Sequence, residues 1–254
     1  MQDKIWIGAV NYLNTKPLLY GLEQGALGDL VELSGDYPAR IASRLMEGSI
    51  DAGLVPVAVI PRLKQHYIIA DYCIGCDGDV ASVCLFSNEP IEELDTVILD
   101  YQSRSSVNLF RILLKEFWKL DIKLVNGGPG FEDRIEGKTG VILIGDRALK
   151  KRRHVNHIYD LGGAWKQHTG LPFVFAAWVA NKPLPAEFVT TFNQTNAEGF
   201  NHLEEIVSKI DFPEYDLMKY YTRDIDYTLD ERKMQGMKLF LEKLSLLPPA
   251  DPGQ

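Results

Sequence analysis

The sequence has few of the side chains on which many catalytic and metal sites depend. It holds 5 histidines and 3 cysteines among 254 residues. With so few thiols and no secretory signal, we expect a reducing, cytoplasmic setting without a disulfide framework. Cys73-x-x-Cys76 lacks the second pair or nearby histidines that zinc needs, and therefore predicts ordinary buried thiols. His154-x-x-His157 is an equally incomplete metal motif.

Long apolar runs and excess positive charge are also missing. No stretch is apolar and long enough to span a membrane, and none follows the N-terminal residues as a signal peptide would. The 27 Lys and Arg residues are outnumbered by 35 Asp and Glu residues, which gives a formal net charge of −8. The one basic cluster, Lys150–Arg153, is typical of a solvated loop. We therefore expect neither nucleic acid nor membrane as a partner.

Several common motifs of enzymes are absent as well. The chain shows no Ser-His-Asp order, no P-loop and no Rossmann fingerprint. Gly127-Gly128-Pro129-Gly130 is rich in glycine, but its proline and the lack of a following Lys-Ser/Thr predict a surface turn. A nucleotide-binding function is therefore disfavoured.

The sequence does carry a strong α/β pattern, with 46% hydrophobic residues, enough for one large domain or two lobes. Short apolar segments alternate with amphipathic ones throughout the chain. The predicted strands are 4–10, 31–34, 52–56, 67–70, 81–87, 96–99, 122–125, 140–144 and 174–180. The predicted helices are 17–25, 38–48, 57–63, 106–117, 146–151, 185–210 with an interruption left open, 215–221 and 230–244.

The predicted strands 81–87 and 174–180 are long and apolar, and each borders a change of pattern. A compact α/β segment lies between them, and the chain after the second is mostly helical. We therefore predict a first lobe of residues 1–87 and 177–254 and a second lobe of residues 88–176, joined by two crossing strands. Such a layout places a ligand cleft between the lobes.

Four polar turns follow predicted strands, at residues 11–15, 54–56, 100–106 and 144–147. Ser105 and Ser106 open a helix, where they either cap it or leave backbone N–H groups for an anion, with Arg104 nearby. Asp146 either caps its helix or stands in the cleft as a carboxylate. The Ser82 hydroxyl either contacts a ligand or bonds to the backbone.

Segments of the chain resemble a known family. They are "GAVNYLNTKPL", "YPARIASRLMEGSIDAGLVPVAVI", "DVASVCLFS", "SRSSVNLFRILL", "VILIGDRAL" and "DLGGAWKQHTGLPFVFAAWVAN", and they extend to about residue 181. Together they resemble the menaquinone-biosynthesis proteins of the futalosine route, in the chorismate dehydratase branch. One departure is "SRSS", where "SRTS" is commoner; the swap keeps a hydroxyl.

The resemblance implies a two-lobed α/β fold of the type II periplasmic-binding-protein-like kind. It implies that chorismate loses water to give 3-[(1-carboxyvinyl)oxy]benzoate, without metal or organic cofactor. A sister branch forms 1,4-dihydroxy-6-naphthoate and looks to carry a histidine where this chain has Gly145. That difference favours the dehydratase branch.

The resemblance also implies roles for single residues. Asn14 matches a position beside the reacting centre. The expected substrate-binding residues, from the matching motifs and from the polar turns, are Asn11, Pro56, Ser82, Ser105, Ser106, Gly145 and Asp146.

Asparagine is not a general base near neutral pH, so the proton acceptor must be another group. We hypothesise that the enolpyruvyl carboxylate of the substrate takes the ring proton; Lys16 is the rival candidate. A solute-binding protein for small anions remains an alternative, because the predicted fold alone indicates only ligand binding. The sequence leaves a homodimer open. Trp165, Phe173 and Trp178 either pack in the core, as apolar aromatic positions usually do, or line the cleft.

Overall fold

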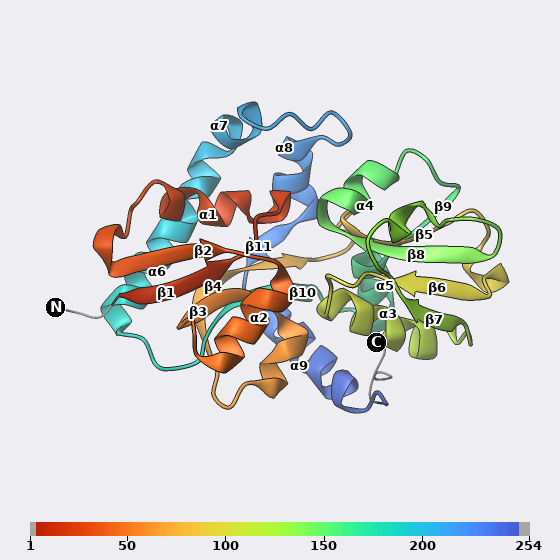
Figure 1. The fold of residues 1–254 in the computed structure, drawn as a ribbon, viewed down its shortest axis with the longest axis horizontal. Helices are drawn as coiled ribbons and strands as arrows, with labels where there is room; N and C mark the ends of the chain where they lie inside the picture. The colour runs from red at the N-terminus through yellow and green to blue at the C-terminus, as the bar shows by residue number, and fades with distance from the viewer. Residues whose placement is uncertain (1–3, 249–254) are drawn as a thin grey trace.

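Residues 4–248 are described by a computed structural model, which contains two β-sheets flanked by helices (Figure 1). The first sheet has six strands in the order β11-β4-β10-β3-β1-β2. Their bounds are β1 (Ile5–Ala9), β2 (Val31–Gly35), β3 (Ala52–Pro56), β4 (Tyr67–Cys76), β10 (Phe173–Ala180) and β11 (Asp226–Thr228). β1 pairs parallel with β2 and β3, whereas β10 runs antiparallel to β3 and β4.

The second sheet has five strands in the order β7-β6-β8-β5-β9. Their bounds are β5 (Val83–Ser87), β6 (Thr96–Leu99), β7 (Lys123–Asn126), β8 (Thr139–Ile144) and β9 (His157–Asp160). β6 is parallel to β7 and β8, and β5 is antiparallel to its two neighbours. The continuous apolar runs of β3 and β5 fit their places inside the sheets, where every residue of both strands is buried.

Helices cover both faces of the two sheets. In Figure 1, α1 and α7 lie above the first sheet and α2 and α9 lie below it. The α-helices are α1 (Lys16–Glu23), α2 (Pro38–Glu47), α3 (Ser105–Leu113), α4 (Gly145–Lys151), α5 (Leu161–Thr169), α6 (Ala186–Glu198), α7 (Leu203–Ser208), α8 (Leu217–Lys219) and α9 (Glu231–Ser245). Shorter 3-10 turns are η1 (Leu13–Thr15), η2 (Gly28–Leu30), η3 (Val57–Arg62), η4 (Ile91–Glu93), η6 (Phe131–Asp133) and η7 (Gly199–His202), and π-helical turns are η5 (Leu114–Trp118) and η8 (Tyr220–Asp224).

The residues at the two ends of α2 show why a helix forms where the sequence predicts one. Pro38 occupies the first turn, where its missing N–H costs nothing, and Gly48 ends the helix with φ of 75°. Ile41, Ala42 and Leu45 form the buried face between these ends. The expected alternation of strands and helices is confirmed, and the fold has two lobes.

Strand pairing differs from the predicted division of the chain at residues 87 and 88. β5 pairs with β8 and β9, so it belongs wholly to the second sheet and does not cross between lobes. An apolar run shows that a strand is buried but not which sheet it joins, so we propose that the boundary between the lobes lies before β5. We propose that residues 77–82 make the first crossing and residues 170–172 the second.

The core continues from one lobe to the other. Trp165 of α5 packs edge-on against Phe173 of β10 and Phe240 of α9, and all three are fully buried. Trp178 is buried too and donates from its indole N–H to Asn196 Oδ1 at 2.8 Å. Trp165, Phe173 and Trp178 therefore pack in the core, as expected by default.

Within residues 4–248, none of the helices combines the length and the apolar character that crossing a membrane requires.

Candidate functional site

A cavity lies between the lobes at the ends of four strands. Its lining comes from the residues that follow β1, from the end of β3, from the turn between β6 and α3, and from the junction of β8 and α4. β1 and β3 are parallel neighbours, as are β6 and β8, so their carboxyl ends meet across the gap. The non-protein space is about 630 Å³, open solvent included, which suits a small molecule. The expected interlobe cleft is therefore present.

Asn14 lines this cavity from the short turn η1. The turn is tied on several sides: Thr15 Oγ1 donates to the Val10 carbonyl at 2.6 Å, and the Tyr227 hydroxyl donates to the Asn14 carbonyl at 2.9 Å. The Leu13 N–H donates across the lobes to Asp146 Oδ1 at 3.1 Å. The Asn14 side-chain oxygen is buried and has no hydrogen-bond partner in the described part of the chain. The backbone of Asn14 is thus fixed while its amide remains available to a ligand.

Ser82 reaches the cavity from the first crossing segment, in a strained setting. Ala81, the residue before it, adopts φ of 63°, which is rare for a residue with a side chain. The Asp160 carboxylate accepts from the N–H of Ala81 at 2.7 Å, and the Ser82 carbonyl accepts from the Gly145 N–H at 2.7 Å. Hydrogen bonds on both sides of Ser82 therefore maintain the strained backbone conformation. Ser82 itself is 1% exposed.

The serines that begin α3 have different surroundings. Ser105 Oγ donates to the Phe175 carbonyl at 2.8 Å and lies 3.3 Å from the Ala58 N–H, so it links α3 to the first lobe. Ser103 Oγ accepts from the Ser106 N–H at 3.2 Å. Arg104 occupies the N-cap position of α3, and its side chain makes no capping hydrogen bond. The first-turn N–H groups other than that of Ser106, together with the Ser106 hydroxyl, thus remain for a ligand anion, which the helix dipole favours.

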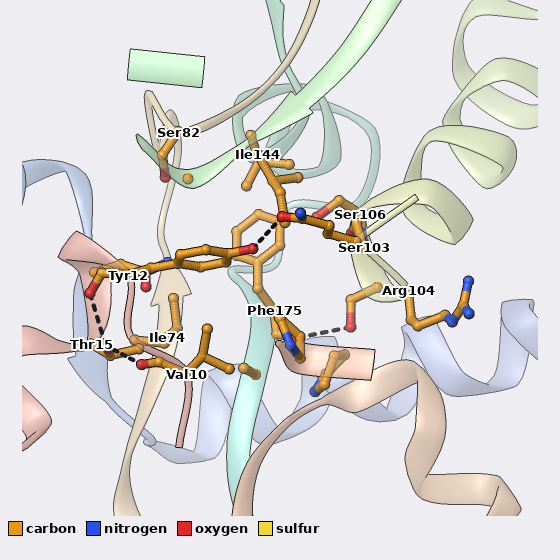
Figure 2. Close-up of a pocket in the computed structure, with 18 of the residues that line it drawn as sticks. Val10, Tyr12, Thr15, Ile74, Ser82, Ser103, Arg104, Ser106, Ile144 and Phe175 are labelled. Carbon is orange, nitrogen blue, oxygen red and sulfur yellow. Dashed lines mark hydrogen bonds between the residues drawn. The ribbon is translucent and has the colours of Figure 1, made fainter. Parts of the chain in front are cut away.

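Tyr12 extends across the cavity from the first lobe toward Ser103 and Ile144 (Figure 2). Its hydroxyl donates to Gln102 Oε1 at 2.6 Å, and Gln102 is also contacted by Arg147 at 3.2 Å. Arg147 in turn forms an ion pair of 2.8 Å with Asp100. Burial raises the pKa of Tyr12, so this phenol stays protonated near neutral pH. Tyr12 therefore joins the lobes through a neutral hydrogen bond.

The cavity wall is mainly apolar, and it holds hardly any charge. Among the described residues, no carboxylate, histidine, lysine or cysteine lines it, and Arg104 is its one cationic side chain. Asp100 and Asp146 lie behind the wall, where burial raises the pKa of both carboxyls. The Arg147 guanidinium opposes that rise at Asp100, and the Leu13 N–H does so at Asp146. The wall thus offers amide and hydroxyl groups and no evident general base.

The structure brings most of the predicted site residues together. Those that line the cavity are Asn14, Pro56, Ser82, Ser105, Ser106 and Gly145. Asn11 does not: it is exposed and lies outside the lining, because the strand ends before it and the turn directs Tyr12 and Asn14 inward instead. Asp146 is not in the lining either, because its carboxylate is bound to the Leu13 N–H. We therefore remove Asn11 from the candidate site and treat Asp146 as a residue that positions η1.

Sequence reasoning passed over other residues of the lining. Tyr12, Gln102 and Ser103 stand in the polar turns that the sequence singled out, so their location was within reach. Phe175 lies in β10, where an apolar strand residue gives no sign that it faces a ligand. No group of three or more His, Cys, Asp or Glu side chains in residues 4–248 is placed to hold a metal ion. Cys73 and Cys76 are buried in β4, as expected of ordinary thiols.

The sequence profile of a family described as menaquinone biosynthesis matches residues 5–245. The chain belongs to this family.

Two relatives carry the same name, chorismate dehydratase. The protein from Thermus thermophilus is 28% identical to this chain, with 94% of this chain and 95% of the relative aligned. The protein from Campylobacter jejuni is 27% identical, with 88% of this chain and 86% of the relative aligned. The two alignments thus cover most of this chain.

Solved structures agree on the fold of this menaquinone biosynthesis family member. An Archaeoglobus fulgidus protein matches with a TM-score of 0.75 at 11% identity, covering 96% of this chain and 97% of that one. The periplasmic aliphatic sulphonate binding protein of Escherichia coli matches with a TM-score of 0.62 at 15% identity, covering 98% and 95%. At these identities the likeness shows a periplasmic-binding-protein-like fold and nothing about ligands.

Proposed function

We propose that this protein is a chorismate dehydratase, a hydro-lyase that converts chorismate to 3-[(1-carboxyvinyl)oxy]benzoate and water. Membership of the menaquinone biosynthesis family and the names of the two relatives support the proposal. The observation in the structure that carries it is a mainly apolar cavity with a few amide and hydroxyl groups, whose lining, within the described residues, has no side chain suited to act as a base.

The reaction makes modest demands on the protein. Chorismate loses a ring hydrogen and the neighbouring hydroxyl, and the ring becomes aromatic, so the conversion runs downhill. The enzyme has to hold the ring in one geometry and stabilise the charge that develops as the bonds break. Fixed neutral donors are suited to both tasks.

The arrangement fits a dianionic substrate. One carboxylate would lie at the start of α3, where Ser106 and the first-turn N–H groups offer donors and Arg104 stands at the edge of the cavity. The ring would lie near Asn14 and Ser82. Because Lys16 is absent from the lining, the enolpyruvyl carboxylate of the substrate is the better candidate to take the ring proton.

The local geometry at Gly145 favours this reaction over that of the naphthoate-forming sister branch. Gly145 has φ of 59°, a conformation that suits glycine. A Cβ at this position would lie 3.6 Å from the Tyr12 ring, which is an ordinary contact distance. It is therefore the backbone conformation that disfavours the histidine expected of the sister branch.

Incubation of the purified protein with chorismate tests the proposal. We expect the diene absorbance of chorismate to fall and one aromatic product to appear, with the mass of chorismate less one water. Binding of chorismate without conversion would support the alternative of a solute-binding protein for small anions. A cytoplasmic location and a homodimer stay predictions from the sequence.

Asn14→Ala is the sharpest variant for the mechanism. We expect kcat to fall by about 10²-fold, because loss of one fixed donor at a reacting centre commonly has that effect. Asn11→Ala removes the same group three residues earlier, at an exposed position outside the lining, and is the matched control. Equal kcat in both variants would remove Asn14 from the mechanism.

Lys16→Met tests the origin of the proton acceptor. Lys16 begins α1 and lies outside the lining, so we expect this variant to turn over chorismate at nearly the wild-type rate. A collapse of turnover with chorismate binding intact would identify Lys16 as the base and contradict the substrate-assisted mechanism.

A further inference from the structure

The polar groups of the candidate site are closed off from solvent in this structure. Ser82 and Ser106 are buried, and so is the side-chain oxygen of Asn14. A ligand can therefore reach these groups only when the lobes move apart, and it can leave only in the same way. Two-lobed folds open and close around ligands by hinge motion. The contacts that join the lobes at the mouth of the cavity thus control access to the site.

Tyr12 and Gln102 lie at this mouth. Both line the cavity and are partly exposed, whereas other lining residues, such as Leu54 and Ser82, are buried. Tyr12 follows β1 in the first lobe and Gln102 follows β6 in the second. The Tyr12 side chain spans the cavity (Figure 2), and its hydroxyl donates to Gln102 Oε1 at 2.6 Å. A single hydrogen bond therefore links the lobes across the opening.

Contacts between the lobes elsewhere at the site differ in their position. Ser105 Oγ donates to the carbonyl of Phe175, which lies three residues after the proposed second crossing. Parts of the lobes that are close to a crossing move least when the cavity opens. The Leu13 N–H, which donates to Asp146 Oδ1, is next to Tyr12 in the chain and moves with it. Opening of the cavity thus has to break the contact between Tyr12 and Gln102.

The second lobe alone holds the acceptor in place. Arg147 donates to the same Gln102 Oε1 at 3.2 Å, and the Gln102 side-chain N–H donates to the Tyr101 hydroxyl at 3.0 Å. The backbone N–H of Gln102 donates to Asp100 Oδ1 at 3.0 Å. Arg147 is itself paired with Asp100 and lies 5.7 Å from the centre of the Tyr101 ring. The acceptor oxygen of Gln102 therefore keeps its position when the lobes separate.

The first lobe positions the donor in the same way. The carbonyl of Tyr12 accepts from the Thr15 N–H at 3.1 Å and from Thr15 Oγ1 at 2.8 Å. These bonds fix the backbone from which the Tyr12 side chain extends. Both partners are thus held by their own lobes, and the bond between them can break and form again without refolding of either side.

We propose that Tyr12 and Gln102 form a latch at the mouth of the cavity, which has to open for chorismate to enter and for the product to leave. The identity of these ligands rests on the proposed dehydratase function. One neutral hydrogen bond changes an equilibrium constant by about twofold to tenfold. The latch therefore favours the closed state and still opens readily. In the closed state water is kept from the reacting groups, which strengthens the interactions of the fixed donors with developing charge.

Tyr12→Phe tests the latch, because it keeps the ring and removes only the hydroxyl. We expect the rate constant for dissociation of the product, 3-[(1-carboxyvinyl)oxy]benzoate, to rise by about twofold to tenfold in stopped-flow dilution. The kcat for chorismate should stay the same or rise, since release of product often limits turnover. Tyr20→Phe is the matched control: its hydroxyl also donates to a side chain, Glu205 at 2.9 Å, but Tyr20 is outside the lining.

Gln102→Leu removes the other half of the latch. It should raise the dissociation rate constant by a similar factor, and Tyr12→Phe should add little to it, because both substitutions remove the same bond. Fully additive effects of the two substitutions would contradict the latch.

A measurement without ligand tests the latch independently of the reaction. Spin labels on Glu23→Cys and Glu136→Cys report the distance between the lobes, since both positions are exposed and lie on different lobes. The native thiols, Cys73, Cys76 and Cys84, are buried and should stay unlabelled. Pulsed electron paramagnetic resonance should show a larger population at long distance when Tyr12→Phe is added to the labelled protein. Adding Tyr20→Phe should leave the distances unchanged.

The outcomes separate the latch from the proposed function. If the wild type converts chorismate and Tyr12→Phe changes neither the dissociation rate constant nor the distances, the latch is wrong and the dehydratase function stands. A lower melting temperature alone would then show a purely structural role. A tenfold fall in kcat with unchanged product dissociation would place Tyr12 at the reacting atoms and also overturn the latch. If the wild type does not convert chorismate, the dehydratase function is wrong and the distances alone decide on the latch.

Discussion

Neighbouring serines at the start of α3 show how single residues divide their tasks in this site. The Ser105 hydroxyl forms hydrogen bonds with the first lobe: it donates to the Phe175 carbonyl and accepts from the Ala58 N–H. Ser106 lines the same cavity, and its N–H donates to Ser103 Oγ, so its hydroxyl is not engaged in joining α3 to the first lobe as that of Ser105 is. The sequence predicted both as ligand contacts, whereas the structure gives Ser105 a role in joining α3 to β10.

This division predicts opposite effects for two alanine substitutions. Ser105→Ala leaves two buried backbone groups with one partner fewer, so we expect the free energy of unfolding to fall by about 1–3 kcal/mol. Ser106→Ala removes a hydroxyl that does not join α3 to the first lobe, so stability should change by less than about 0.5 kcal/mol while chorismate binds more weakly. Urea denaturation and titration with chorismate measure the two effects. The interpretation fails if the more destabilising substitution is Ser106→Ala.

Prediction from sequence worked at the residue scale where a side chain stood in a polar turn after a strand. Asn14, Ser82 and Gly145 were found in this way or through the family resemblance, and all three line the cavity. Phe175 was out of reach, because an apolar residue inside a strand gives no sign that it faces a cavity. Hydrogen-bond partners were equally out of reach, since the bonds of Ser105 join residues 47 and 70 positions away.

At the scale of secondary structure, the junction of β9 and α5 supports the first crossing. Asp160 caps α5 by accepting from the N–H groups of Gly162 and Gly163, and the same carboxylate accepts from Val80 and Ala81. One side chain therefore fixes a helix start and the strained segment that presents Ser82. Burial raises the pKa of this carboxyl, although the N–H groups of Val80 and Ala81 oppose the rise.

Asp160→Ala should therefore affect both folding and catalysis. We expect a loss of about 2–4 kcal/mol in the free energy of unfolding, because several buried N–H groups lose their acceptor. The kcat for chorismate should fall as well, since Ser82 is no longer held in place. Asp230→Ala is the control: Asp230 caps α9 through the Lys233 N–H, and its loss should cost about 1 kcal/mol without changing kcat. Unfolding curves and kcat for the two variants decide the matter, and equal kcat values would contradict the supporting role of Asp160.

Some elements could not be predicted from the sequence, because their residue types or their length do not indicate the secondary structure that they form. The segment "DLGGAW" forms the start of α5 although glycine disfavours helices. A Cβ at Gly162 would lie 2.5 Å from Cys76 Sγ in β4 and 2.6 Å from the Gly78 carbonyl in the crossing segment, so both pack too closely for a side chain. Packing between distant segments thus selects glycine here, and a single sequence cannot show such a contact. β11 has three residues, too few for a periodic pattern.

At the scale of the whole molecule, the lobes are joined by backbone, by aromatic packing and by polar contacts across the cavity. Phe240 of α9 packs on Phe173 of β10, and Trp165 of α5 packs on both, so the second crossing is enclosed in the core. Tyr12 and Leu13 add hydrogen bonds to Gln102 and Asp146 in the second lobe. The two lobes were predictable from the α/β alternation, but the position of the crossings was not, because strand pairing depends on contacts that periodicity does not encode.

Burial across both lobes also predicts how the molecule responds to alkaline pH. The three cysteines, Cys73, Cys76 and Cys84, are buried, and burial raises the pKa of each thiol, to about 12 for Cys73. An unfolded thiol ionises at about pH 8.5. Above that pH the unfolded state loses three protons that the folded state keeps, so ionisation favours unfolding. The stability supplied by the protonated thiols is thus complete below about pH 8.5 and is lost as pH rises toward the folded pKa values.

The predicted slope gives this argument a quantitative test. Three thiols should lower the free energy of unfolding by about 4 kcal/mol per pH unit above pH 9, and Cys73→Ala should reduce that slope to about 2.7 kcal/mol. Urea denaturation at intervals from pH 7.5 to 10, under reducing conditions, measures both slopes. Cys73→Ala also lowers stability at every pH by leaving a small cavity, so the slope and not the absolute value is compared. Parallel curves for the variant and the wild type would show that Cys73 ionises in the folded protein as readily as in the unfolded chain, and the burial argument would then be wrong for this thiol.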